Sequence, residues 1–154
     1  MEALKINVLY LDDENENLQS FSASFRKFFN IYTTNNVAEA YEIMQQNQIH
    51  VAISDQKMPG ISGVEFFENI IDTHPDVIRI LITAYSDLDS VIDAINKGQV
   101  YRYFSKPWDR DEIVSTVYGA YKIYKDRKEA QKLNEQLQET NEQLEFMLRQ
   151  RLIS

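Results

Sequence analysis

The sequence predicts an α/β fold in which five parallel strands form a doubly wound sheet with helices on both faces. Short apolar runs alternate with amphipathic segments along most of the chain, as in successive βαβ units. The apolar runs are not interrupted by a polar residue at every second position, so both faces of each strand are expected to be buried. Right-handed crossovers then favour the strand order 2-1-3-4-5.

Five segments are expected to be strands because they are short, apolar and rich in β-branched residues. They are residues 6–11, 31–34, 49–54, 77–83 and 100–104. Five helices are expected because apolar residues recur at helical spacing between and after these runs. They are residues 14–29, 37–46, 62 or 63 to 72, and 88–97, and a long C-terminal helix that begins at Asp109, a suitable N-cap residue.

Composition limits the class of protein. The 154 residues are enough for one domain of ordinary size and an appendage, and a hydrophobic content of 44% is enough for a core. The absence of cysteine excludes a disulfide scaffold and thiolate metal sites. No apolar run approaches the roughly 18 residues that span a bilayer, so we expect a cytoplasmic protein without a membrane partner. The net charge of -8 argues against a nucleic-acid partner.

Polar residues follow or end four of the expected strands. Asp12 and Asp13 follow the first strand, Asp55 follows the third, Thr83 ends the fourth and Lys106 follows the fifth. Each has a simpler interpretation by itself, such as a helix cap, a turn residue or a solvated lysine. In the order 2-1-3-4-5, however, the carboxyl ends of these strands meet at one edge, beside the point where strand order reverses.

Three clustered carboxylates repel one another unless a cation neutralises them. An oxygen-only donor set without His or Cys suits a hard ion, so Mg²⁺ is the expected cofactor. Asp55 could then attack phosphorus as a nucleophile, while Lys106 and the Thr83 hydroxyl stabilise the phosphoryl oxygens. The residues therefore indicate phosphoryl chemistry, with Asp55, Thr83 and Lys106 as its catalytic groups.

Four motifs carry a resemblance to a known family. They are "YLDDENEN" around Asp12 and Asp13, "SDQKMPGISG" around Asp55, "LITAYSD" around Thr83 and "YFSKPWD" around Lys106. With these motifs in order, the chain resembles the receiver domain of two-component response regulators over residues 5–124. The resemblance implies a metal site of Asp12, Asp13, Asp55 and Lys57, in which Asp13 and Asp55 bind Mg²⁺ and Lys57 contributes its backbone carbonyl.

The resemblance also implies partners and a switch. Asp55 would take its phosphoryl group from a histidine kinase or a phosphotransfer protein. The Lys106–Pro107 peptide bond would be cis, and Tyr103 would be the aromatic switch residue that pairs with Thr83. In such a switch Thr83 moves toward the phosphoryl group and Tyr103 rotates inward to fill the space that it leaves.

The C-terminal tail, residues 125–154, is expected to be a coiled-coil helix beyond a domain of residues 1–124. "LNEQLQE" is followed directly by "TNEQLEF", a seven-residue repeat. The seam consists of Ala130, Leu133, Leu137, Thr140, Leu144 and Met147. We expect a homodimer through this helix; the alternative is a single amphipathic helix that folds back on the domain.

The sequence therefore predicts a phosphorylation-dependent signalling switch, not an enzyme except toward its own phosphorylation and dephosphorylation. The alternative is the receiver and linker of a longer regulator, whose cyclic-dinucleotide or phosphatase output lies beyond Ser154. A haloacid-dehalogenase-type phosphohydrolase is disfavoured because it needs D-x-D, whereas Asp12 and Asp13 are adjacent. A flavodoxin-like binding protein shares the strand order but needs a Ser/Thr/Gly-rich phosphate loop, which "DDENEN" does not supply.

Overall fold

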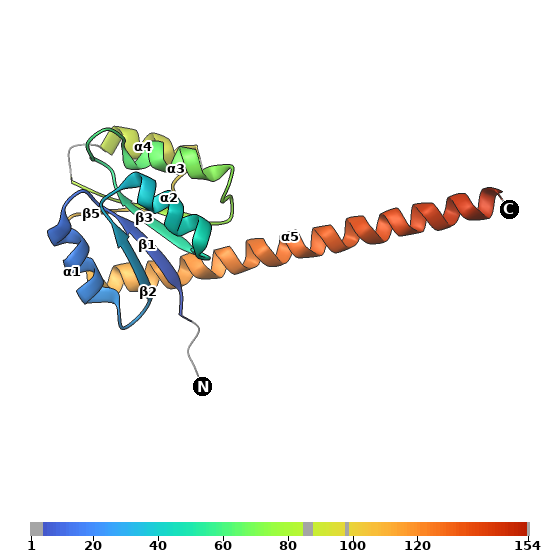
Figure 1. Ribbon diagram of the computed structural model, residues 1–154, viewed down its shortest axis with the longest axis horizontal. Helices are drawn as coiled ribbons and strands as arrows, with labels where there is room; N and C mark the ends of the chain where they lie inside the picture. Colours follow the sequence, from blue (N-terminus) through green and yellow to red (C-terminus); the bar gives the residue numbers. More distant parts are fainter. Residues whose placement is uncertain (1–4, 85–87, 98, 154) are drawn as a thin grey trace. The chain divides into compact units, whose positions relative to one another are not determined.

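The computed structural model describes residues 5–84, 88–97 and 99–153, and it confirms the predicted α/β fold (Figure 1). Five parallel strands form a sheet in the flavodoxin-like order β2-β1-β3-β4-β5. The strands are β1 (Asn7–Leu11), β2 (Asn30–Thr34), β3 (Val51–Asp55), β4 (Ile78–Thr83) and β5 (Arg102–Ser105). The order reverses between β1 and β3, so the carboxyl ends of these two strands flank the switch point.

Helices cover both faces of this sheet, because the strands present apolar side chains on both sides. The helices are α1 (Asn15–Phe25), α2 (Val37–Gln46), α3 (Gly63–Ile71), α4 (Leu88–Asn96) and α5 (Arg110–Ile153). One core cluster joins the sheet to α1 and the first turns of α5, with Phe21 and Val117 among its members. The other joins the sheet to α2, α3 and α4, with Met44, Phe67 and Val91 among its members.

Most element boundaries differ from the prediction by one or two residues, and the end of α1 differs by four. The helix expected over residues 14–29 ends at Phe25, and the N–H groups of Phe28 and Phe29 both donate to the Phe25 carbonyl in a tight turn. The chain must leave the helix there because Asn30 already pairs with the first strand. The fifth strand begins at Arg102, because pairing with β4 starts at that residue, although Val100 is buried.

The chain divides into two compact units, Met1–Tyr124 and Lys125–Ser154, and helix α5 contributes to both. The first unit contains the sheet and all of its packed helices. In the second unit, every side chain of residues 125–153 is exposed. Among the described residues, no helix combines the length and the apolarity that crossing a bilayer requires.

Gly63 lets the start of α3 lie directly against the end of β3. A Cβ atom at this position would lie 2.5 Å from the backbone oxygen of Asp55 and 2.7 Å from Leu81 Cδ2. The Gly63 N–H donates to the Gln56 carbonyl at 2.9 Å, which fixes the same approach. Because the nearest atom is backbone, it cannot move aside as a flexible side chain would.

We therefore predict that Gly63→Ala lowers the free energy of unfolding by about 1–3 kcal/mol, the usual cost of forcing an extra methyl group into a packed site. Gly119→Ala is the matched control, because in the described part of the chain the one atom near a Cβ there would be the Tyr101 hydroxyl oxygen, at 3.9 Å. Gly119 lies inside helix α5, where Ala stabilises by about 0.5–1 kcal/mol relative to Gly. Urea titrations of both variants measure the two changes, and equal effects would contradict the prediction.

Candidate functional site

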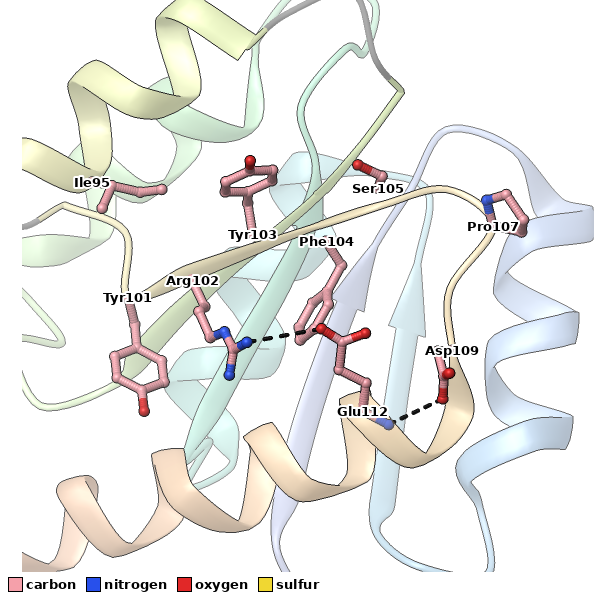
Figure 2. Close-up of a pocket in the computed structure, with 9 residues that line it drawn as sticks. All are labelled: Ile95, Tyr101, Arg102, Tyr103, Phe104, Ser105, Pro107, Asp109 and Glu112. Carbon is pink, nitrogen blue, oxygen red and sulfur yellow. Dashed lines mark hydrogen bonds and ion pairs between the residues drawn. The ribbon is translucent and has the colours of Figure 1, made fainter.

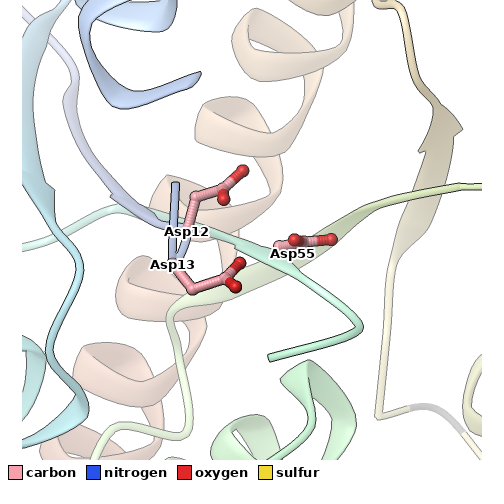
Figure 3. Close-up of side chains that lie close together, drawn as sticks. All are labelled: Asp12, Asp13 and Asp55. Atoms are coloured by element: carbon pink, nitrogen blue, oxygen red, sulfur yellow. The ribbon is translucent and has the colours of Figure 1, made fainter. Parts of the chain in front are cut away.

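Three carboxylates converge at the carboxyl edge of the sheet. Asp12 and Asp13 follow β1, and Asp55 is the last residue of β3, so the switch point brings them together (Figure 3). One oxygen from each lies within 4.8 Å of the other two. Asp12 is 0% and Asp55 is 6% exposed, whereas Asp13 faces solvent. The cluster is therefore open on one side, through Asp13.

Protein donors already surround the Asp12 carboxylate. Its Oδ2 accepts hydrogen bonds from the Tyr10 hydroxyl at 2.6 Å, from Asn17 Nδ2 at 3.1 Å and from Lys106 Nζ at 3.2 Å. Its Oδ1 accepts from the Glu14 backbone N–H at 2.9 Å. These bonds stabilise a negative charge that has been removed from water.

Lys106 joins two of the carboxylates. Its Nζ lies 3.2 Å from an oxygen of Asp12 and 3.2 Å from an oxygen of Asp55. Burial disfavours the charged ammonium, but the charges of Asp55 and Asp12 outweigh it, so the pKa of Lys106 is raised. The Lys106–Pro107 peptide bond is cis, and the Lys106 N–H donates to the Thr83 carbonyl at 3.0 Å.

Burial by itself lowers the pKa of the Lys106 ammonium, but it has the opposite effect on the Asp55 carboxyl. It raises the pKa of Asp55, and the neighbouring Asp12 adds to this shift, while the Lys106 ammonium opposes it. The net rise means that the folded protein disfavours the ionised form of Asp55, although one cation is already present. The Lys106 ammonium therefore does not fully compensate the negative charge of the cluster, and a second cation would be bound favourably.

The predicted Thr83 and Tyr103 lie on neighbouring strands beside the cluster. Thr83 ends β4, next to the partner of Asp55 in the strand register, and it is 2% exposed. Its hydroxyl donates to the Ala84 carbonyl at 3.0 Å. Tyr103, on β5, is half-buried against the second core cluster. The cluster of acids thus includes neither side chain, and Lys57 lies in the exposed segment after β3.

A groove of about 520 Å³ lies between helix α4, strand β5 and the start of α5 (Figure 2). Tyr103 points toward Ile95 of α4, whereas Phe104 points to the opposite side of the strand. Arg102 makes a 3.8 Å ion pair with Glu112 along the α5 side. Asp109 caps α5 as predicted, since its Oδ1 accepts from the Glu112 N–H at 3.2 Å.

Three residues around the acids were not predicted from the sequence. Tyr10 and Asn17 donate to Asp12, and the ring of Trp108 lies 6.2 Å from that of Tyr10 in a perpendicular arrangement. Residues two apart on a strand point to the same side, so the spacing of Tyr10 and Asp12 was a usable signal. Trp108 and Asn17 carried no comparable signal, because their positions depend on how α1 and α5 pack.

The donor chemistry of the cluster fits Mg²⁺. Three carboxylates and no nitrogen or sulfur ligand suit a small hard cation. Asp13 and Asp55 are the better candidates for direct ligands, because the Asp12 oxygens already accept hydrogen bonds. The acidic cluster therefore has the composition of a magnesium site.

The family is decided by a comparison with known protein families. The family model of the response regulator receiver domain matches residues 8–118. The chain belongs to this family. The matched residues include the acids, Thr83 and Lys106. Receiver domains typically bind Mg²⁺ at an acidic pocket, and the structure has a cluster of this kind in Asp12, Asp13 and Asp55.

Relatives and solved structures agree with this assignment. The chain is 31% identical over 124 residues to the hydrogenase transcriptional regulatory protein HoxA of Bradyrhizobium diazoefficiens, a match over 80% of this chain and 26% of that protein. The response regulator receiver domain protein of Clostridium thermocellum has 27% identity and a TM-score of 0.72, over 81% of this chain and 98% of that one. The signal receiver domain of an HD domain-containing protein from Pseudomonas fluorescens Pf-5 has 25% identity and a TM-score of 0.76, over 84% of this chain and 96% of that one.

The receiver therefore spans about a quarter of the length of the curated relatives that it matches. Receiver domains are components of signalling switches that work with histidine kinases, and they are not enzymes in the usual sense. At this level the predicted family and the predicted class of function are confirmed.

We predict that Asp55→Asn stabilises the metal-free receiver, because the folded protein disfavours the ionised Asp55. A carboxyl whose pKa is raised in the folded protein lowers the free energy of unfolding above that pKa, and this loss disappears as the pH falls and the carboxyl is protonated. The difference in free energy of unfolding between Asp55→Asn and wild type should therefore become smaller at acidic pH. In millimolar Mg²⁺ we expect wild type to become the more stable of the two proteins, because the ion stabilises the folded wild type by binding to it and binds the variant less. Thermal melting with Mg²⁺ or EDTA measures both effects; a variant less stable than wild type in EDTA would contradict the prediction.

Proposed function

We propose that this receiver is a phosphorylation-dependent switch in which Asp55 accepts a phosphoryl group from a histidine kinase or a phosphotransfer protein. The observation that carries the proposal is the position of the Asp55 carboxylate, between two other acids and the Lys106 ammonium. An Asp55 oxygen forms a bond to phosphorus, and the bond from phosphorus to the donor's imidazole nitrogen breaks with its electron pair on nitrogen. The later attack of water on phosphorus returns Asp55 and releases phosphate.

The residues around Asp55 have distinct parts in this transfer. Mg²⁺, when bound, neutralises the acids and the incoming phosphoryl oxygens. Asp12 and Asp13 supply charge to hold it, and the Lys57 carbonyl is a proposed further ligand. Lys106 already lies against an Asp55 oxygen, so its ammonium can pair with a phosphoryl oxygen after only a small movement.

Thr83 and Tyr103 are proposed as the switch residues. Among the described residues, the Thr83 hydroxyl donates to the neighbouring Ala84 carbonyl, a contact that it can exchange for a phosphoryl oxygen. Tyr103 is half-buried on the α4 side of β5 and lines the 520 Å³ groove, so its ring has space in which to change position. Phosphorylation would thereby reshape the surface of α4, β5 and α5.

The decisive experiment is phosphorylation with labelled acetyl phosphate and Mg²⁺. Wild type is expected to take up label, and Asp55→Asn to lose it completely, because an amide is no nucleophile toward phosphorus. Asp111→Asn is the matched control: it changes the same chemical group at an exposed position in the first turn of α5, away from the cluster. Equal labelling of Asp55→Asn and wild type would refute Asp55 as the acceptor.

We further propose that residues 1–124 form the receiver domain and that residues 125–154 form a coiled-coil helix through which two copies dimerise. The seam side chains are exposed in the single chain: Leu133 and Leu137 at 60%, Leu144 at 52% and Met147 at 63%. A second copy with the same seven-residue repeat would cover them. The flanking positions carry Gln and Asn, so apolar contact rather than charge would drive association.

We predict that Leu137→Asp dissociates the dimer. A buried Leu side chain contributes about 1.5–3 kcal/mol, and the substitution removes one from each copy, so the dissociation constant should rise on the order of a hundredfold or more. Gln138→Asp adds the same charge one residue away from the seam and should leave the dimer intact. Sedimentation equilibrium with and without beryllofluoride, a phosphoryl mimic, measures both; a wild type that is monomeric in both conditions would refute the dimer.

A second candidate function differs only in what the switch controls. The chain would be the receiver and linker of a longer regulator, with a cyclic-dinucleotide enzyme or a phosphatase as its output beyond Ser154. Two observations favour it: the curated relatives match over about a quarter of their length, and one similar structure is the receiver domain of an HD domain-containing protein. The reading frame that follows Ser154 in the gene distinguishes the two candidates.

A further inference from the structure

The hydrogen bonds at Asp12 Oδ2 exceed what a carboxylate oxygen ordinarily accommodates. An ionised carboxylate offers about four acceptor sites, two on each oxygen. Oδ2 nevertheless has three protein donors, from Tyr10, Asn17 and Lys106. It therefore has no unused lone pair for a metal ion as long as these donors stay in place.

Tyr10 differs from the other two donors because its side chain is fixed. Its ring is 0% exposed, lies 4.3 Å from the ring of Phe21 in a stacked arrangement, and meets Trp108 edge-on. Asn17 and Lys106 are only partly buried and have flexible side chains. The Tyr10 hydroxyl also makes the shortest of the three bonds, at 2.6 Å, a length typical of a hydroxyl that donates to a charged oxygen.

We propose that Tyr10 is a positioning residue that holds the Asp12 carboxylate on the protein side and keeps its Oδ2 out of the first coordination shell of Mg²⁺. The inference rests on the proposed function, since it concerns the ion that the acidic pocket binds. Asp13 and Asp55 are then the direct carboxylate ligands, and water fills further positions, as Mg²⁺ prefers. Asp12 contributes charge without a bond to the ion.

Two properties of the hydrogen bond from Tyr10 to Asp12 determine whether its loss raises or lowers the affinity for Mg²⁺. The phenol withdraws negative charge from Asp12, which weakens the attraction of the pocket for a cation. It also occupies an oxygen that could otherwise bind the ion directly, because the other two donors to that oxygen, Asn17 and Lys106, have flexible side chains that can give way to the ion. Removal of the hydroxyl should therefore tighten metal binding, whereas a residue that merely filled the core would leave the affinity unchanged once the protein is folded.

The test compares Mg²⁺ binding to wild type, Tyr10→Phe and the control Tyr41→Phe by isothermal titration calorimetry. Tyr41 carries the same hydroxyl on α2, where it accepts a hydrogen bond from Asn69 Nδ2 at 3.1 Å. The dissociation constant of Tyr10→Phe should fall by about threefold to tenfold, the scale expected for one ordinary hydrogen bond, while Tyr41→Phe should match wild type. Water-proton relaxation with Mn²⁺ should show one fewer coordinated water in Tyr10→Phe.

An affinity of Tyr10→Phe that equals or falls below that of wild type would overturn the inference, and so would tighter binding with an unchanged number of coordinated waters. Asn17→Ala removes another donor to the same oxygen without touching the core, so it should tighten binding to a smaller degree. If Tyr10→Phe does not fold, an unchanged affinity of Asn17→Ala counts against the inference and a tighter one supports it. A wild type that binds no Mg²⁺ would instead refute the proposed metal site itself.

Discussion

The contact of one ammonium with two buried carboxylates is the constraint around which the rest of the receiver is arranged. Lys106 approaches Asp12 and Asp55 at equal distances, and without it the two acids would face each other with no compensating charge. The same lysine is tied through its backbone to Thr83 at the end of β4. The charge balance of the pocket is therefore coupled to the relative position of β4 and β5, and hence to the start of α5.

The two faces of the sheet differ in how tightly they are packed next to the acids. The aromatic cluster of α1 and α5 supports the acids from one side, through Tyr10 and its contact with Phe21. Tyr103 lies on the other side, between β5 and α4, where the groove offers room for movement. A packed cluster under the acids and a less filled space beside Tyr103 suit the proposed two-state switch, because one part of such a switch must stay fixed while the other changes.

The position of the acids could be predicted because it follows from topology. Parallel strands end at the same edge, so residues far apart in sequence, such as Asp12 and Asp55, had to approach once the strand order was known. The end of α1 could not be predicted in the same way: helical spacing continues through Phe28 and Phe29, and only the pairing of Asn30 with the first strand stops the helix. Hydrogen bonds such as that of Tyr10 depend on side-chain directions that an apolar pattern does not record. The dimer seam stays a prediction, because one chain cannot show what covers an exposed leucine.

The chain contains a single tryptophan, Trp108, two residues after Lys106. Its indole lies edge-on to both Tyr10 and Phe21, at 6.2 and 5.7 Å between ring centroids, and so belongs to the packed side of the pocket. The protein thus carries its own fluorophore two residues from Lys106, the lysine that would move from aspartate to a phosphoryl group in the proposed transfer. If the proposed transfer takes place, a change in the emission of this tryptophan would follow it over time in an unlabelled sample, without any partner protein present.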